Sequence, residues 1–277
     1  MKRFVSLKAY GDVVIACNSL RGQDKLTNQL VCGRYLKPLL DAIEYEGNVI
    51  YLDLECEQVP AIFDIQKQGL INAISSTFMI RRSLLAICDN NDQLVFDRVG
   101  FREHLIANGR DIVGIKGDKS NIYLDYQSFF LNHIDFNQRK VTREILNIGI
   151  FPNSRHLRKE LNESLILALV LECQKLGFDA HVVYVTNQPY VNFSFSSLCI
   201  SGFDSLVKSI KEFDLIVSAD SLPAHIAEYF GINVFVFSPV DNHYWLPKSA
   251  FLNGAYAKFD EVIKFKKWLA RIKRIIK

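Results

Sequence analysis

The sequence predicts an α/β protein with two domains, each built around a parallel β-sheet. The 277 residues are 49% hydrophobic, which is enough for one or two domains with their own cores. Short continuous apolar runs alternate with segments of helical periodicity, most clearly between residues 148 and 257, and the N-terminus opens with the same pattern. Strands of a parallel sheet are continuous apolar runs because helices cover both of its faces.

The second half of the chain gives the clearer pattern. Gly177 and Gly231 follow two of the predicted helices, and glycine in such a position commonly ends a helix. The alternation of strands and helices predicts a Rossmann-like domain. We expect strands at 148–151, 181–185, 215–218 and 234–237, and helices at 161–176, 205–212 and 224–230.

The first half starts in the same way and then becomes less regular. Residues 84–88 and 93–97 flank Asp89-Asn90-Asn91-Asp92, a turn signal that predicts a hairpin. A polar stretch at 137–144 predicts a boundary between domains of 1–143 and 144–277. The other expected elements are strands at 4–7, 49–54, 111–114 and 121–125 and a helix at 12–20.

Composition excludes several classes of protein. The net charge of +3 is too balanced for a protein that coats nucleic acid. The six cysteines are dispersed without a C-x-x-C pair, which predicts reduced thiols and a cytoplasmic protein. Polar residues interrupt the N-terminal apolar run, and no stretch reaches 18 apolar residues, so we expect neither a signal peptide nor a membrane-spanning helix.

Ligands of paired α/β domains bind at the carboxyl ends of the parallel strands, which draws attention to the loop after 215–218. Residues 218–225 join this strand to a helix N-terminus, where unpaired N–H groups and the helix dipole favour an anion such as a diphosphate. The alternative is that Asp220 or Ser221 caps the helix and that His225 is a partly buried packing residue.

This loop belongs to a longer motif. Residues 218–247 read S-A-D-S-L-P-A-H-I-A-E-Y-F-G-I-N-V-F-V-F-S-P-V-D-N-H-Y-W-L-P, which resembles the C-terminal signature of the bacterial heptosyltransferase family, glycosyltransferase family 9. In that family the pattern is D-[ST]-G-x-x-H, a helix, a strand ending in G-P-[TS]-[DN], and then W-x-P. Leu222 and Ser238 stand where the family usually has glycine, and the Cβ of Leu222 would hinder close approach of the backbone to a phosphate.

A second loop fits the same family. Residues 148–155 read I-G-I-F-P-N-S-R and resemble the first C-terminal strand and the loop that holds the donor diphosphate. The resemblance implies that the diphosphate is bound by Asn153, Ser154, Arg155, Arg158 and Lys159, whose cations would reach the phosphate oxygens. The alternative is a solvated helix start with ordinary surface charges.

The N-terminal segment L-K-A-Y-G-D-V-V-I-A, residues 7–16, resembles the first strand and the G-D-V loop of the family. Gly11 would permit a tight turn, and Asp12 would project from the helix start into the cleft between the domains. The resemblance implies that Asp12 is the general base, because an inverting sugar transfer needs a group that takes the proton of the acceptor hydroxyl. The alternative is that Asp12 is simply an N-cap.

The C-terminal segment concentrates positive charge. Residues 258–277 contain eight basic and two acidic side chains, so residues 1–257 carry a net charge of −3. The segment 264–277 predicts either a helix on the anionic inner leaflet of a membrane or a terminal helix that packs on a domain with its charges in solvent. On a helical wheel, one arc is apolar and contains Phe265, Trp268, Leu269, Ile272, Ile275 and Ile276.

The sequence therefore predicts a GT-B fold, with an acceptor-side Rossmann-like domain and a nucleotide-sugar-binding one. The expected activity is inverting transfer of a sugar, typically heptose in this family, from a nucleotide-diphosphate donor to lipopolysaccharide core or another cell-surface glycan. No metal or other cofactor and no nucleic acid is expected, and the location is cytoplasmic, with peripheral contact at the inner membrane as one interpretation of residues 264–277. With Asp12 as the base, the expected donor site comprises Gly11, Asn153, Ser154, Arg155, Arg158, Lys159, Asp220, Ser221, Leu222 and His225.

Two other functions stay open from the residues. A protein that kept the scaffold and lost turnover would bind nucleotide or glycan without transfer, and Leu222 and Ser238 are the departures that suggest it. The other open function is that of an epimerase or a nucleotide-sugar hydrolase with similar diphosphate loops. The motif matches cover both ends of the chain and thin out between residues 21 and 145.

Overall fold

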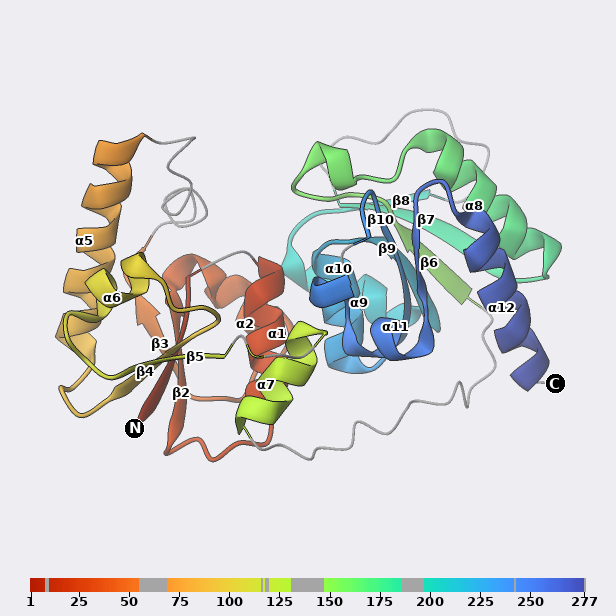
Figure 1. Ribbon diagram of the computed structural model, residues 1–277. Helices are drawn as coiled ribbons and strands as arrows, with labels where there is room; N and C mark the ends of the chain where they lie inside the picture. Colours follow the sequence, from red (N-terminus) through yellow and green to blue (C-terminus); the bar gives the residue numbers. More distant parts are fainter. Residues whose placement is uncertain are drawn as a thin grey trace. The chain divides into compact units, whose positions relative to one another are not determined.

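The computed structural model (Figure 1) describes residues 1–7, 10–54, 69–115, 117, 120–130, 147–185, 197–241 and 243–276. They form two compact units, which we describe separately. The first unit comprises Met1–Lys119 and Asp125–Asn132, and the second comprises Ser120–Leu124 and His133–Lys277. The boundary predicted between residues 143 and 144 lies outside the described residues and stays a prediction.

The sheet of the first unit is parallel, with strand order β3-β2-β1-β4-β5. Its strands are β1 (Lys2–Ser6), β2 (Asn28–Gly33), β3 (Val49–Leu52), β4 (Gln93–Phe96) and β5 (Ile112–Gly114). The described helices are α1 (Tyr10–Leu20), η1 (Arg34–Leu36), α2 (Lys37–Ala42), α5 (Leu70–Ile87) and α6 (Phe101–Ala107). Helix α7 (Ile122–Phe130) begins among the residues of the second unit and ends among those of the first. All of these strands except β2 are predicted from the sequence, with each end within two residues of the observed one.

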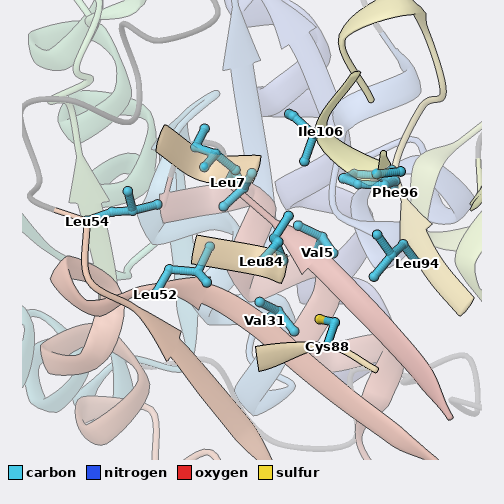
Figure 2. Close-up of a cluster of buried hydrophobic side chains, with 12 residues drawn as sticks. Val5, Leu7, Val31, Leu52, Leu54, Leu84, Cys88, Leu94, Phe96 and Ile106 are labelled. Atoms are coloured by element: carbon cyan, nitrogen blue, oxygen red, sulfur yellow. The ribbon is translucent and has the colours of Figure 1, made fainter. Parts of the chain in front are cut away.

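The core of the first unit lies where its sheet meets α5 and α6 (Figure 2). Apolar residues of the strands point toward one face of α5, because a parallel sheet must be covered by helices to keep its apolar side chains from water. The cluster contains Val5, Leu7, Val31, Leu52, Leu54, Ile80, Leu84, Cys88, Leu94, Phe96, Ile106 and Ala107.

The hairpin predicted around residues 89–92 is wrong. Residues 84–87 form the end of α5, and β4 pairs in parallel with β1. Ile80, Leu84 and Cys88 are buried at intervals of four residues, which is the spacing of one helix face and not of a strand. The turn signal is real, but it joins a helix to a strand.

The strand predicted at 121–125 is also wrong, because these residues begin α7. The Oδ1 atom of Asn121 accepts a hydrogen bond of 3.0 Å from the backbone N–H of Tyr123. A polar side chain that satisfies an unpaired N–H in this way favours the start of a helix.

The sheet of the second unit is parallel and has the order β8-β7-β6-β9-β10-β11. Numbered within the unit, this is the 3-2-1-4-5-6 order of dinucleotide-binding Rossmann domains. The strands are β6 (Asn147–Phe151), β7 (Asp179–Val185), β8 (Ser197–Ile200), β9 (Leu215–Ala219), β10 (Asn233–Ser238) and β11 (Tyr256–Lys258). The helices are η2 (Leu157–Lys159), α8 (Glu163–Lys175), α9 (Phe203–Glu212), α10 (Leu222–Phe230), η3 (His243–Trp245), α11 (Lys248–Asn253) and α12 (Val262–Ile276). The predicted Rossmann-like pattern is confirmed, and β8 and β11 are additional.

The apolar side of α12 is part of the core of the second unit. Phe265 and Leu269 are fully buried, and Trp268 lies with its ring centroid 5.0 Å from that of Phe235 on β10. Lys264, Lys266 and Lys267 are exposed. The interpretation in which this apolar arc faces a bilayer is therefore wrong for the described side chains, and the packed terminal helix is what the structure has.

The five cysteines among the described residues are free thiols, and four of them are buried. Burial raises the pKa of Cys32 and of Cys173 to about 12, so both thiols stay protonated at neutral pH. Their environment is that of small core residues.

Gly149 in β6 is a position of the second unit where a side chain is poorly tolerated. A Cβ there would lie 2.5 Å from the Phe213 ring. We expect Gly149→Ala to lower the free energy of unfolding by about 1–3 kcal/mol, because the ring must move within a packed core. Urea unfolding measures the change. Adding Phe213→Leu should recover part of the loss, and a double variant no more stable than Gly149→Ala would contradict this explanation.

Candidate functional site

The candidate site lies at the carboxyl ends of β6 and β9, which are neighbours in the sheet of the second unit. The chain order of the strands reverses between these two, and open α/β sheets bind ligands at such a switch point because the loops there diverge. The loop after β6 contains residues 152–160, and the loop after β9 contains Asp220 and Ser221. The two loops predicted from sequence are therefore brought together.

An ion pair joins the two loops. Lys159 Nζ lies 2.7 Å from Asp220 Oδ2, with 29% of the lysine side chain and 9% of the aspartate side chain exposed. A carboxylate this buried needs a cation or several hydrogen bonds, because burial removes its hydration. The result is a partly exposed ammonium group held at the edge of the sheet.

A hydroxyl makes the second connection. Ser221 Oγ donates to the carbonyl of Asn153 at 3.0 Å and lies 3.3 Å from the carbonyl of Ala219. Ser221 occupies the N-cap position of α10, yet its side chain does not bond to the helix. The Ser221 side chain therefore does not cap the helix. Asp220, the other residue considered as a cap, accepts a hydrogen bond from Lys159.

Other bonds fix the shape of the loop after β6. Asn153 Oδ1 accepts from the backbone N–H of Val185 at 2.9 Å, which ties the loop to the end of β7. The Glu160 carboxylate accepts from the backbone N–H of Ser154 at 3.3 Å and from Asn153 Nδ2 at 3.4 Å. The backbone N–H of Ser154, a residue expected to bind the diphosphate, therefore donates to a carboxylate.

The two predicted arginines of this loop differ from Lys159. Arg155 and Arg158 are exposed, and no ion pair joins either of them to another residue in the described ranges. Leu222 is the first residue of α10 and is half-buried. The structure thus assembles Asn153, Lys159, Asp220 and Ser221, and it leaves the two arginines at the surface beside them.

His225 lies on α10 and is buried, with 6% of its surface exposed. Its Nδ1 atom is 3.0 Å from the hydroxyl of Tyr123, and the two rings are stacked with centroids 6.1 Å apart. Burial lowers the pKa of His225 to about 4; the nearby Asp220 opposes the shift and Lys159 adds to it. The imidazole is therefore neutral at physiological pH.

Tyr123 and Asn121 are site residues that the sequence analysis does not identify. Asn121 is fully buried, and its Nδ2 donates to the carbonyls of Leu246 at 2.9 Å and His243 at 3.2 Å. It thereby holds the segment that contains the W-x-P motif. Asn121 precedes an apolar run, which is a recognised signal for a helix start, but its partners lie more than 120 positions away.

Asp12 and Gly11 belong to the first unit. Asp12 lies half-buried in the first turn of α1, the helix that follows β1, and β1 adjoins β4 at the switch point of that sheet. The turn predicted at Gly11 before the helix is wrong, because α1 already includes this residue. Its backbone is not in the left-handed region that would require glycine. Whether Asp12 faces a cleft stays a prediction.

Comparison with known proteins places this fold. No family model matches the sequence, and no curated protein matches it. A solved glycosyltransferase family 9 protein from Veillonella parvula matches with a TM-score of 0.61 at 13% identity, over 99% of this chain and 97% of that one. The E. coli heptosyltransferase WaaC with ADP-2-deoxy-2-fluoro heptose gives 0.57 at 11% identity, over 96% and 99%. E. coli ADP-heptose lipopolysaccharide heptosyltransferase II gives 0.56 at 11% identity, over 98% of each chain.

These likenesses define the fold class as GT-B, with two Rossmann-like units that each carry a parallel sheet. More narrowly, the fold is the one seen in glycosyltransferase family 9 and in the heptosyltransferases, as the sequence motifs indicate. The predicted fold is confirmed, and it is shared with these structures.

The neutral state of His225 gives a testable pH dependence. Unfolding returns its pKa from about 4 to the ordinary value of 6.5, so between these values the unfolded chain binds a proton that the folded chain does not. We therefore expect this residue's contribution to stability to fall as the pH falls from 6.5 to 4. Urea unfolding of the wild type and of His225→Gln, each at pH 7 and pH 4.5, measures it. An equal loss in both proteins would contradict the assignment.

Proposed function

We propose that the protein is an inverting glycosyltransferase that uses a nucleotide-diphosphate sugar and transfers the sugar to a cell-surface glycan such as lipopolysaccharide core. The observation that carries this proposal is the Lys159–Asp220 pair at the carboxyl ends of β6 and β9. It puts a cation, a carboxylate and a helix N-terminus at the position where Rossmann domains bind nucleotides.

The donor chemistry follows from what each group can bond. A diphosphate offers only acceptors, so it needs Lys159 Nζ, backbone N–H groups at the start of α10 and the neutral imidazole of His225. We assign the Tyr123 hydroxyl as the donor to Nδ1 of His225. The imidazole proton is then on Nε2, which makes Nε2 a hydrogen-bond donor. Asp220 cannot bond to phosphate oxygens, and we assign it to hydroxyl groups of the donor, with Lys159 offsetting its charge.

Transfer requires one proton to move and two bonds to change. The acceptor hydroxyl gives its proton to the Asp12 carboxylate while its oxygen bonds to the anomeric carbon. The bond from that carbon to the diphosphate breaks on the opposite face, and the nucleotide diphosphate leaves with the electron pair. Lys159 and the α10 amides stabilise the charge that develops on the leaving group.

The first candidate donor is an ADP-sugar. The WaaC structures contain ADP or ADP-2-deoxy-2-fluoro heptose, and the second E. coli relative is an ADP-heptose enzyme. Their likeness to this chain supports testing ADP-heptose before other donors. The acceptor and the donor sugar are part of the proposal.

We expect Asp12→Asn to bind donor as the wild type does and to lose about 10²–10⁴-fold in transfer rate, because the carboxylate acts on the acceptor proton. Calorimetric titration with ADP and a transfer assay with ADP-heptose and a lipopolysaccharide-core acceptor measure the two effects. Asp41→Asn is the matched control, since Asp41 is an exposed carboxylate of the same unit paired with Lys37.

Three outcomes would count against a transferase. No transfer by the wild type despite donor binding indicates a binding protein. Release of nucleotide without acceptor indicates a hydrolase, and formation of an epimer of the sugar indicates an epimerase.

We expect Lys159→Met to weaken ADP binding about 10- to 100-fold, because a charge-assisted contact to phosphate is lost. Lys175→Met is the matched control: Lys175 also pairs with a carboxylate at 2.7 Å, on the exposed surface of α8. Titration calorimetry of both variants checks the difference. Equal affinity of the two variants for ADP would remove Lys159 from the donor site.

A further inference from the structure

Helix α5 has two apolar faces, and one of them is exposed. Ala73, Thr77, Ile80 and Leu84 form the buried face. Ile80 and Leu84 belong to the core cluster of the first unit. The opposite side exposes the residues that we call the α5 apolar face: Ile71 (82% exposed), Ile74 (48%), Phe78 (53%) and Met79 (37%).

This concentration on one helix separates the α5 apolar face from ordinary surface residues. Single exposed apolar side chains are common, whereas contiguous patches mark an interaction surface. In the second unit the exposed large apolar residues are distributed over several elements, such as Leu157, Leu198 and Leu252. On α5, Ile71, Ile74 and Phe78 follow one another at the spacing of a single helix face.

The charges of α5 indicate the kind of partner. The eleven residues from Leu70 to Ile80 carry no charge, and Arg81 and Arg82 follow them. The sequence of α5 contains neither Asp nor Glu. Arg81 lies 5.8 Å from the centre of the Phe78 ring and donates a hydrogen bond to Asn108 Oδ1, whereas Arg82 is exposed. Apolar side chains beside cations match the boundary between anionic headgroups and acyl chains.

Two other occupants fit these observations less well. A symmetric contact between α5 helices of two copies would offer Arg81 and Arg82 no acidic side chain from α5. Among the described residues, α5 has the length and hydropathy of a membrane span, with a mean hydropathy of 1.2 over 18 residues. Its buried face is engaged in the core, however, and a helix held in this way can lie on a bilayer but not cross it.

We propose that the α5 apolar face binds the surface of an anionic phospholipid bilayer, with Arg82 at the headgroups. This places membrane contact on the first unit and not on α12. The proposal concerns attachment and does not depend on the transferase activity.

Vesicle flotation tests the proposal. The full-length protein should bind vesicles of phosphatidylglycerol and phosphatidylethanolamine and bind phosphatidylcholine vesicles weakly. The triple variant Ile71→Ser, Ile74→Ser, Phe78→Ser should lose at least about tenfold in partitioning, because three apolar side chains no longer enter the bilayer. Arg82→Ser should lose about fivefold on anionic vesicles.

Matched controls locate the effect. Leu167→Ser with Leu171→Ser removes two leucines of α8 that are 45% and 44% exposed, and its binding should equal that of the wild type. Lys267→Ser removes an exposed cation of α12 and should change binding less than Arg82→Ser does. Thermal unfolding verifies that each variant is folded.

Several results would overturn the proposal. One is a wild type that binds no vesicle of either composition, and another is a triple variant that binds as well as the wild type. A loss confined to Lys267→Ser would place the contact on α12. A dimer in sedimentation analysis that the triple variant dissociates, without any lipid binding, would assign the face to a second copy of the chain.

Discussion

The position of β6 in the middle of its sheet is the constraint on which the candidate site depends. The first strand of the second unit, β6, pairs with β7 on one side and with β9 on the other. The chain therefore extends the sheet on the β7 side first and later crosses to the β9 side. The loops after β6 and β9 therefore meet without being neighbours in sequence. Lys159 and Asp220, 61 positions apart, are in contact for this reason.

Electrostatics then decides what the site does with its polar groups. Asp220 is almost buried and pairs with a lysine, whereas burial lowers the pKa of His225 and keeps its imidazole neutral. A site that combines a cation, a carboxylate and a neutral imidazole can bond acceptors and donors at once, which suits a ligand with both phosphate and hydroxyl groups. Glu160 adds a constraint, because its carboxylate accepts the hydrogen bond of the Ser154 N–H, and a phosphate would have to replace it there.

Local patterns predict much of the second unit and both of its loops. Each loop follows a continuous apolar strand and precedes a helix, so its place at the sheet edge follows from periodicity alone. The contact between Tyr123 and His225 could not be predicted in this way, since it spans 102 positions and depends on where α7 begins. The bond of Ser221 is also beyond such patterns, because its position is that of a cap while its hydroxyl bonds to another loop.

The errors of prediction have a common physical origin. A turn signal says that the chain reverses but not what it joins, and residues 84–87 are helical. The amphipathic pattern of α12 indicates an apolar side without identifying its partner, which is the core around Phe235. Amphipathicity predicts that a face is covered, and tertiary packing determines by what.

The second unit is discontinuous along the chain, because Ser120–Leu124 belong to it while Asp125–Asn132 belong to the first unit. A fragment that begins at His133 would lack Tyr123 and Asn121, and with them the phenol on His225 and the amide that holds the His243 and Leu246 carbonyls. The two units therefore cannot be exchanged at a single junction in the chain. Chimeras that recombine such halves need three crossover points, and the shortest exchanged piece would be the five residues Ser120–Leu124.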